Sequence, residues 1–295
     1  MRKILPILFI TAGICLMMYP MASEYVYENR ADSVIRTYEL QTEETGNEKK
    51  KEMLEAAYSY NELLLQSQVK LTDPFTVTDV HGENMDYYGI LSFDSTGYMG
   101  AIEIPDISVK LPIYHGTDAE VLEHGAGHLE GSSLPVGGPG THAVLSGHTG
   151  LNTAKMFTDL TEMEKGDLFF IHILDETLAY KVNDISVVEP SSTDLLAIRT
   201  GKDLVTLITC TPYGVNSHRL LVTGERTMYT AGMCEDISKD REDAVSGSLW
   251  MKTYKKAVLT GIGTAIAAAV IIWACNKFVK RKEGKQFVWG RRQSR

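Results

Sequence analysis

The amino-acid sequence predicts a mainly β domain, a barrel or a sandwich, that follows a helical segment and lies between two membrane-spanning helices. Three observations support this fold class. Short runs rich in Val, Ile, Leu and Thr, with turn residues between them, recur through residues 99–228. Residues 23–70 have helical character. Residues 4–20 and 257–275 carry no charged side chain, and each is close to the roughly 20 apolar residues that cross a bilayer as a helix.

The β region contains apolar runs that are separated by turn signals. In residues 109–113, Lys110 lies between apolar neighbours, an alternation typical of a half-buried strand. Two short helical pieces are expected near residues 118–124 and 155–163. The runs are MGAIEIP, ISVKLPIYH, THAVLSGH, DLFFIHIL, ETLAYKVNDISVVE, DLVTLITC and RLLVTGER.

The helical segment precedes a stretch of different character. In KKEMLEAAYSYNELLLQSQ, apolar side chains recur every three or four residues, and the polar residues 43–51 are expected to turn the chain between two helices. Residues 71–98 begin with Thr72-Asp73-Pro74, and a residue before proline is pushed out of the helical region. We therefore expect an irregular segment lying on a surface.

The flanks of the two apolar segments predict the topology. Arg2 and Lys3 precede the first segment, which is either a retained anchor or a cleaved signal peptide. The tail 277–295 carries eight Lys and Arg residues against one acid. Because short basic flanks stay in the cytoplasm, both termini are expected inside the cell, with the middle of the chain outside, at the cell membrane.

These boundaries divide the chain into seven segments. They are a membrane anchor or signal segment (1–22), a helical segment (23–70), a segment at 71–98, the β domain (99–228), a polar stalk or a helix that joins the barrel (229–256), a transmembrane helix (257–276) and a basic tail (277–295).

The charge of the middle part restricts the class of partner. Between the two terminal basic clusters, 19 Lys and Arg residues stand against 37 Asp and Glu residues, a net charge of about −18. A nucleic-acid-binding domain has the opposite sign, so we expect no nucleic-acid partner.

The cysteines single out one position. Cys15 and Cys275 lie in the apolar segments and count as small apolar residues. Cys210 and Cys234 remain; a disulfide between them is possible by count, but a domain of this size does not need one. No role is assigned to Cys234, whereas a free Cys210 requires another explanation.

The surroundings of Cys210 are typical of a nucleophile. Cys210 ends an apolar run, and a turn sequence separates it from Arg219, which opens the next run. Adjacent strands joined by this loop would place the guanidinium beside the thiol, where it can stabilise a thiolate or an oxyanion. His148 also ends an apolar run, and Cys with His is the minimal apparatus for acyl transfer through a thioester. By composition alone, a buried Cys with two surface polar residues remains an equal alternative.

Other histidines do not indicate a metal site. The spacing matches no standard zinc motif, and we expect polar residues scattered on loops, with no metal and no cofactor. These residues are His115, His124, His128 and His142.

Three long blocks of this sequence resemble a known family. Thr206-Leu207-Ile208-Thr209-Cys210 resembles the nucleophile motif of sortases. LVTLITCTPYGVNSHRLLVTGER, MGAIEIPDISVKLPIYHG and HLEGSSLPVGGPGTHAVLSGHTGL resemble the pilus-assembling subgroup called class C, and the similarity covers about residues 65–230. The resemblance implies a closed eight-stranded β-barrel flanked by two transmembrane helices.

The resemblance also implies roles. Cys210 would attack the Thr–Gly bond of a Leu-Pro-any-Thr-Gly (LPXTG) sorting signal on a pilin or another surface protein. His148 would protonate the leaving amine and later take a proton from the incoming amine, and Arg219 would bind the developing oxyanion. The acceptor would be a Lys amine of another pilin, which gives an isopeptide bond, or alternatively a peptidoglycan amine.

The segment Asp73-Pro74-Phe75 resembles the lid of class C sortases. In that interpretation Asp73 pairs with Arg219 and Phe75 covers Cys210. A plain turn is the alternative. Two further functional alternatives are a catalytically idle barrel that binds partners, and a cysteine peptidase that uses water as the acceptor.

Overall fold

The protein is described here from a computed structural model of the whole chain. The description covers residues 4–67, 71–75, 85–94, 96–150, 154–234, 236–237, 254, 256–267, 270–271, 273–274 and 277. The chain divides into two compact units, Met1–Ser246 and Gly247–Arg295. The first unit contains the β domain and its helices, and the second contains a helical stretch at residues 256–267.

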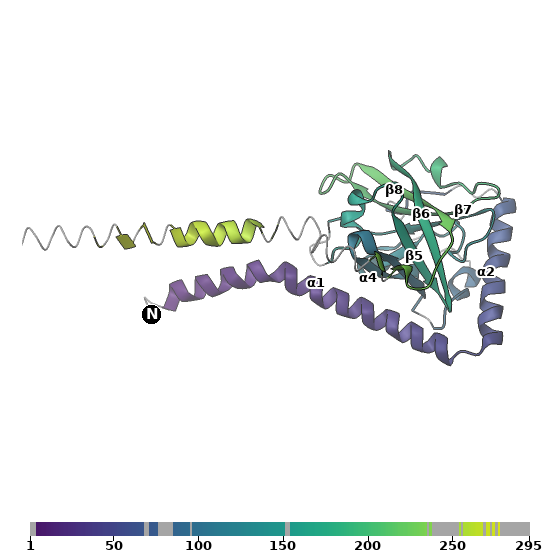
Figure 1. Cartoon of the computed structure of the whole chain (residues 1–295), viewed down its shortest axis with the longest axis horizontal. Coiled ribbons are helices and arrows are strands. Elements are labelled where there is room, and N and C mark those ends of the chain that lie inside the picture. Colours follow the sequence, from purple (N-terminus) through teal and green to yellow (C-terminus); the bar gives the residue numbers. More distant parts are fainter. Residues whose placement is uncertain are drawn as a thin grey trace, which may run out of the picture. The chain divides into compact units, whose positions relative to one another are not determined.

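The β domain is a closed eight-stranded barrel (Figure 1). Its strand order is β1-β2-β3-β4-β7-β8-β6-β5, and β1 also pairs with β5, which closes the sheet. This confirms the predicted mainly β barrel fold with helices. The strands are β1 (Tyr98–Ile104), β2 (Val109–His115), β3 (Ala126–His128), β4 (Thr141–Ser146), β5 (Leu168–Ile173), β6 (Glu176–Val188), β7 (Asp203–Thr211) and β8 (His218–Thr227).

One strand was not expected from the sequence. β3 has three residues, Ala-Gly-His, and pairs in parallel with β2 and antiparallel with β4. A run this short, with one glycine and no β-branched residue, has no strand signal of its own. Pairing with both neighbours makes it a strand.

Alternate residues of the strands face two different apolar clusters. Leu145, Leu207 and Val222 belong to the large cluster inside the barrel. Their neighbours Val144 and Ile208 belong to a smaller cluster on the outer face of β4, β7 and β8. We call the smaller one the outer cluster; its fully buried members are Leu129, Val144, Leu196, Ile208 and Leu221.

The helices precede the barrel or connect its strands. They are α1 (Ile4–Glu44), α2 (Asn47–Ser67), α3 (Met85–Gly89) and α4 (Ala119–His124), with three short 3₁₀ segments η1 (Pro105–Ile107), η2 (Thr158–Glu162) and η3 (Asp194–Leu196). A break at Thr45-Gly46 separates α1 from α2, within the expected turn. The helical pieces expected near 118–124 and 155–163 correspond to α4 and η2.

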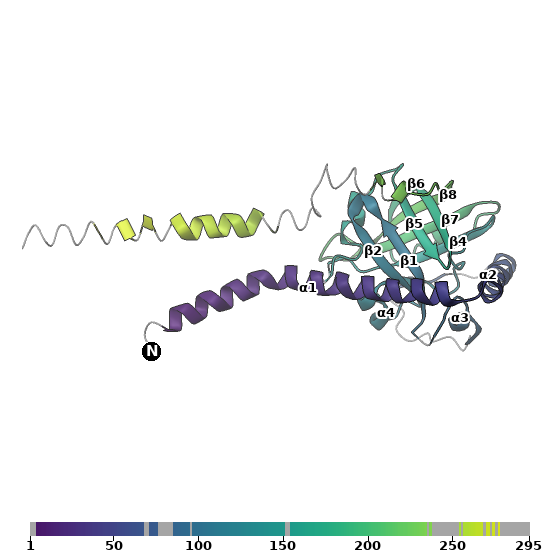
Figure 2. The ribbon, with the colours of Figure 1, turned by 60° about the horizontal axis from the view of Figure 1, so that its bottom comes forward.

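Figure 2 shows α1 passing alongside β1 and β2 of the barrel. Polar side chains of the first two helices bind the barrel. The Tyr38 hydroxyl of α1 donates to the Met99 carbonyl at 2.9 Å and accepts from the Leu174 amide at 3.1 Å. On α2, the Asn61 side chain donates to the Leu134 carbonyl at 3.0 Å and accepts from the Leu134 amide at 2.7 Å. The chain that leaves α2 therefore starts from a fixed point.

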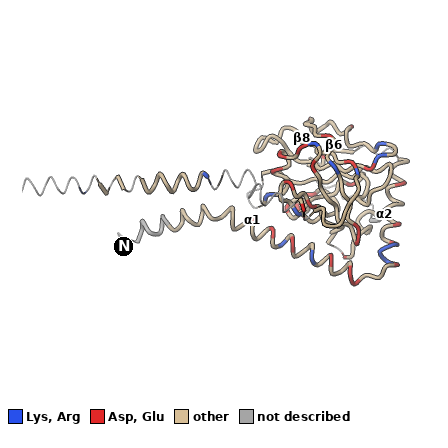
Figure 3. Tube along the Cα trace, viewed as in Figure 1, with Lys and Arg blue, Asp and Glu red and all other residues tan. Residues whose placement is uncertain are grey.

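The two predicted membrane spans are not confirmed. Among the described residues, no helix has both the length and the apolar composition that a bilayer crossing requires. In the sequence, α1 carries charged residues only from Glu24 onward, and Figure 3 shows red and blue positions along the half of α1 that leads into α2. Parts of the second predicted span, at residues 268–269, 272 and 275–276, lie outside the described residues, as does the tail from 278 to 295.

Three histidines correct the expectation of polar residues on loops. His115, His128 and His142 end or occupy strands and are at most 2% exposed. Each forms hydrogen bonds: His128 Nδ1 with the Tyr87 hydroxyl at 2.7 Å, and His142 Nε2 with the Thr206 hydroxyl at 2.7 Å, while His115 Nδ1 bonds the Gly97 carbonyl at 2.8 Å. Buried polar groups with partners serve the packing of the domain.

Two connecting segments are also more buried than expected. Within 71–98, Tyr87 and Leu91 are fully buried in the barrel's main cluster. In the stalk, Cys234 is buried against Phe170 and Ala179 of the barrel, while residues 238–253 lie outside the described residues. The described beginning of the stalk therefore packs on the barrel.

The buried histidines predict loss of stability in acid. Burial lowers the pKa of His128 to about 3 and that of His142 to about 4. The unfolded chain then binds more protons than the native state below about pH 6.5, so the free energy of unfolding falls as the pH drops from 6.5 towards 4. Each histidine contributes up to about 1.4 kcal/mol per pH unit in that window.

The measurement is denaturant unfolding between pH 4.5 and 7.5 on wild type and His142→Gln. The variant should have a shallower slope by up to one proton. Equal slopes for wild type and His142→Gln would contradict the assignment.

Candidate active site

Cys210 and Arg219 lie side by side on neighbouring antiparallel strands. They are register partners of the β7–β8 pair, near the end where a short loop joins the two strands. Cys210 is half-buried, and Arg219 is 5% exposed. His218 is exposed while its neighbour Arg219 is buried, as the alternation of strand residues between two faces requires. Cys210 forms no disulfide with Cys234.

His148 follows directly on β4, the other neighbour of β7. β4 and β7 run parallel, with Ser146 opposite Ile208. The Gly147 amide donates to the Ile208 carbonyl at 3.1 Å, and the Thr209 hydroxyl donates to the Gly147 carbonyl at 2.7 Å. The backbone just before His148 is thus tied to the backbone just before Cys210. The structure therefore brings the three predicted residues to the ends of three consecutive strands.

Asp73 is bound to Arg219 by two parallel hydrogen bonds. Arg219 donates from Nε to Asp73 Oδ1 at 2.7 Å and from Nη2 to Asp73 Oδ2 at 2.7 Å. Both side chains are nearly inaccessible to solvent, at 6% exposure for Arg219 and 5% for Asp73. Bidentate, charge-assisted hydrogen bonds are stronger than hydrogen bonds between neutral groups. Here they join a segment 146 residues away to the barrel.

Phe75 lies over the candidate site. Its ring centroid is 6.0 Å from that of His148 and 5.1 Å from the Arg219 guanidinium carbon. Phe75 and Leu71 also pack against the outer cluster. The Thr193 hydroxyl, in the connection between β6 and β7, donates to the Leu71 carbonyl at 3.0 Å. Residues 71–75, called the lid from here on, are thus closed over the site.

Burial under the lid keeps both titrating groups neutral. Burial raises the pKa of the Cys210 thiol; Arg219 opposes this rise, and Asp73 adds to it. Burial also lowers the pKa of His148, which Glu123 partly opposes. The hydrogen bonds to Asp73 raise the pKa of Arg219 further. At neutral pH the closed form therefore contains a Cys210 thiol and a neutral His148 imidazole, and the lid carboxylate binds the Arg219 guanidinium.

This arrangement supports acyl transfer after the lid opens. A thiol, an imidazole that accepts and returns a proton, and a guanidinium for a developing oxyanion are the groups that thioester chemistry requires. Among the described residues, no cluster of His, Cys, Asp and Glu could hold a metal ion.

Sequence reasoning missed residues that support the site without reacting. Thr209 and Thr193 act through single hydrogen bonds to backbone carbonyls, for which the sequence has no distinctive signal. The outer cluster was readable in part, because Thr206, Ile208 and Cys210 alternate with the apolar interior residues of the same run.

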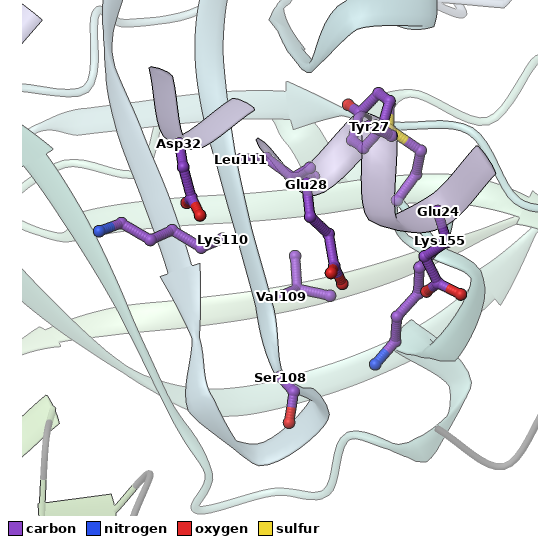
Figure 4. Close-up of a pocket in the computed structure, with 10 residues that line it drawn as sticks. Glu24, Tyr27, Glu28, Asp32, Ser108, Val109, Lys110, Leu111 and Lys155 are labelled. Atoms are coloured by element: carbon purple, nitrogen blue, oxygen red, sulfur yellow. Dashed lines mark hydrogen bonds between the residues drawn. The ribbon is translucent and has the colours of Figure 1, made fainter. Parts of the chain in front are cut away.

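A separate pocket lies between α1 and the barrel (Figure 4). Three acids of α1 lie along it, and the Lys155 ammonium is 3.2 Å from Asp159 and donates to the Ile107 carbonyl. None of the candidate catalytic residues lines it, so it is distinct from the site at Cys210. Its lining consists of Glu24, Tyr27, Glu28, Asp32, Ser108, Val109, Lys110, Leu111, Lys155 and Met156.

Comparison with known proteins identifies the family. Residues 102–227 match the sortase domain. Sortase C-1 of Actinomyces oris is 52% identical, with a TM-score of 0.58, over 61% of this chain and 99% of that chain. Sortase C of Streptococcus pneumoniae is 41% identical, with a TM-score of 0.61, over 68% of this chain and 98% of that chain.

Curated relatives match a shorter region. Sortase A of Bacillus anthracis is 31% identical over 134 residues, which are 45% of this chain and 62% of that protein. Sortase D of Bacillus subtilis is 32% identical over 43% of this chain, and this chain spans only 63% of its length. The solved sortase C structures match more of this chain than the sortase domain does, and so include residues outside that domain.

The chain belongs to the sortase family, a family of cysteine transpeptidases, and within it to class C. This confirms the resemblance to class C sortases that was inferred from three blocks of the sequence.

The lid geometry predicts the effect of Asp73→Ala on thiol reactivity. Removing the carboxylate takes away a charge that raises the pKa of Cys210 and frees Arg219 to stabilise the thiolate. The midpoint of the alkylation rate against pH should move to lower pH. At pH 7 the rate should rise roughly tenfold for each unit by which the pKa falls.

The measurement is alkylation of Cys210 by a small thiol reagent between pH 6 and 10. Asp175→Ala is the matched control, because Asp175 is an exposed carboxylate that pairs with Lys50 at 2.7 Å. The control should match wild type. An unchanged rate and midpoint in Asp73→Ala would rule out the lid as the cover of the thiol.

Proposed function

We propose that this protein is a transpeptidase that cleaves an LPXTG-type sorting signal between Thr and Gly and joins the acyl group to a Lys amine of a pilin subunit. The placement of Cys210, Arg219 and His148 at the ends of three adjacent strands carries the proposal. Membership in class C supports it. The structure of the S. pneumoniae sortase C relative was described in terms of catalysis and pilin substrate specificity.

In the proposed reaction, the lid must first leave. Its departure frees His148 and Arg219 from Phe75, and Arg219 from Asp73. His148 then accepts the thiol proton, and the sulfur attacks the Thr carbonyl carbon. The resulting oxyanion takes hydrogen bonds from Arg219, where Asp73 had been bound. Cleavage of the Thr–Gly bond gives a thioester as His148 passes its proton to the leaving Gly amine.

The second half of the reaction reverses the proton path. The acceptor amine attacks the thioester, His148 takes the proton that it loses, and Cys210 leaves and regains that proton. With a Lys side chain as acceptor, the product is an isopeptide bond between two subunits. The steps are balanced with protein groups alone and require no cofactor. A peptidoglycan amine would follow the same path and would make the enzyme a cell-wall anchoring sortase.

We further propose that the barrel works outside the cell, held at the membrane by the uncharged segments at 4–20 and 257–275. The basic residues at both ends support cytoplasmic termini. Exposed apolar side chains also support a lipid contact, among them Leu16 and Tyr19 on α1 and Leu259, Ile266 and Trp273 in the second unit.

The thioester predicts a specific mass change. Full-length protein incubated with an LPXTG peptide should gain the mass of the peptide without its Gly end, and Asp73→Ala should accumulate this adduct faster because the lid no longer holds Arg219. The measurement is intact mass over time.

Cys210→Ala should give no adduct, and Arg219→Ala should give it at least a hundredfold more slowly, in line with the loss of an oxyanion donor. An adduct in Cys210→Ala would contradict the assignment of Cys210 as the nucleophile. Adding a pilin Lys peptide or a peptidoglycan stem peptide then distinguishes the two acceptors, because the preferred one releases the enzyme as a new amide forms.

A further inference from the structure

Ser146 is a buried hydroxyl between the candidate catalytic residues and the outer cluster. It is the last residue of β4, two positions before His148, and it lies opposite Ile208 of β7. Because strand residues alternate between faces, Ser146 shares the face of Val144, which belongs to the outer cluster. It thus lies on the face of the site, opposite the residue two positions before Cys210.

The Ser146 side chain has no hydrogen-bond partner among the described residues. The residue is completely buried, and no donor or acceptor of the described part of the chain forms a hydrogen bond with its Oγ. Nearby hydroxyls differ: Thr209 donates to the Gly147 carbonyl at 2.7 Å, and Thr206 bonds both His142 and Thr223. A buried polar group without a partner is unusual in native proteins and calls for an explanation.

The position of the lid gives that explanation. Leu71 and Phe75 contribute apolar side chains to the face on which Ser146 lies. They pack there without offering this hydroxyl a polar atom. A peptide that replaces them brings an amide N–H and a carbonyl with almost every residue, and these groups need partners once they leave water.

We propose that Ser146 is a substrate-binding residue whose hydroxyl hydrogen-bonds a backbone amide group of the sorting peptide, on the acyl side of the scissile bond. The inference rests on the proposed function, since it assigns one contact of the same site. The closed lid leaves the hydroxyl unsatisfied and the bound peptide satisfies it, so this contact favours peptide over lid.

The test compares Asp73→Ala with Asp73→Ala/Ser146→Ala in the full-length chain. Both proteins lack the lid carboxylate, so that lid opening does not limit the rate of thioester formation in either of them. The probes are an LPXTG peptide and versions of it in which one backbone amide at a time is replaced by an ester. The serine variant should form the thioester about tenfold more slowly in kcat/KM, the loss expected for one hydrogen bond. Alkylation of Cys210 by a small reagent should stay within twofold, because that reaction needs no peptide contact.

The ester series identifies the partner group. At one position the ester should slow the Asp73→Ala protein about tenfold and the Asp73→Ala/Ser146→Ala protein much less, because that contact is already missing in the double variant. Ser132→Ala in the same background is the matched control. Ser132 is 1% exposed, but its hydroxyl donates to the Leu129 carbonyl and accepts from the Val144 amide, so its loss should lower stability and leave kcat/KM unchanged.

The proposal is overturned if Ser146→Ala leaves kcat/KM for the all-amide peptide within twofold, or if every ester slows both proteins equally. Unchanged alkylation shows that the variant is folded around Cys210. If the Asp73→Ala parent forms no thioester with any peptide, the proposed function itself fails, which this series distinguishes from a failure at Ser146.

Discussion

The ion pair between Asp73 and Arg219 is the contact on which the closed state of the site depends. Two hydrogen bonds of 2.7 Å join a lid carboxylate to the guanidinium that is also the candidate oxyanion donor. A buried pair is costly to break when one partner is left alone in the protein interior. The lid can therefore leave only if both groups reach water, or if a substrate gives Arg219 a new partner. If Arg219 is the oxyanion donor, as proposed, the lid and the transition state compete for this one side chain, and catalysis must replace the interaction that holds the site closed.

The barrel makes this competition possible by fixing strand register. Antiparallel pairing places Arg219 opposite Cys210, and parallel pairing of β4 with β7 brings His148 to the same end. The interior residues of these strands, Leu145, Leu207 and Val222, hold the register through the main core. Because the side-chain period is two, a slip of one residue would turn Cys210 into the core. The precision of the site is thus a consequence of core packing.

Much of the fold and of the candidate site could be predicted from the sequence. The short loop between two apolar runs predicted that Cys210 and Arg219 would be neighbours. The lid pairing came from family resemblance, since no local pattern links Asp73 to a residue 146 positions away. The strand at Ala126–His128 and the buried histidines were missed because tertiary contacts, not local propensity, determine them. The lack of a hydrogen-bond partner for the Ser146 hydroxyl could not be predicted from the sequence, because it depends on which groups surround Ser146 in the folded structure.

The most direct test of mutual exclusion between lid and substrate is equilibrium binding of an LPXTG peptide to inactive protein. The comparison is Cys210→Ala with Cys210→Ala/Asp73→Ala, by calorimetry at one salt concentration. If the lid and the peptide occupy the same place and Arg219 can serve only one of them, breaking the ion pair must lower the Kd, since the peptide no longer works against lid closure. Equal Kd values in the two proteins would contradict the account, because they would mean that the peptide binds without displacing the contact between Asp73 and Arg219.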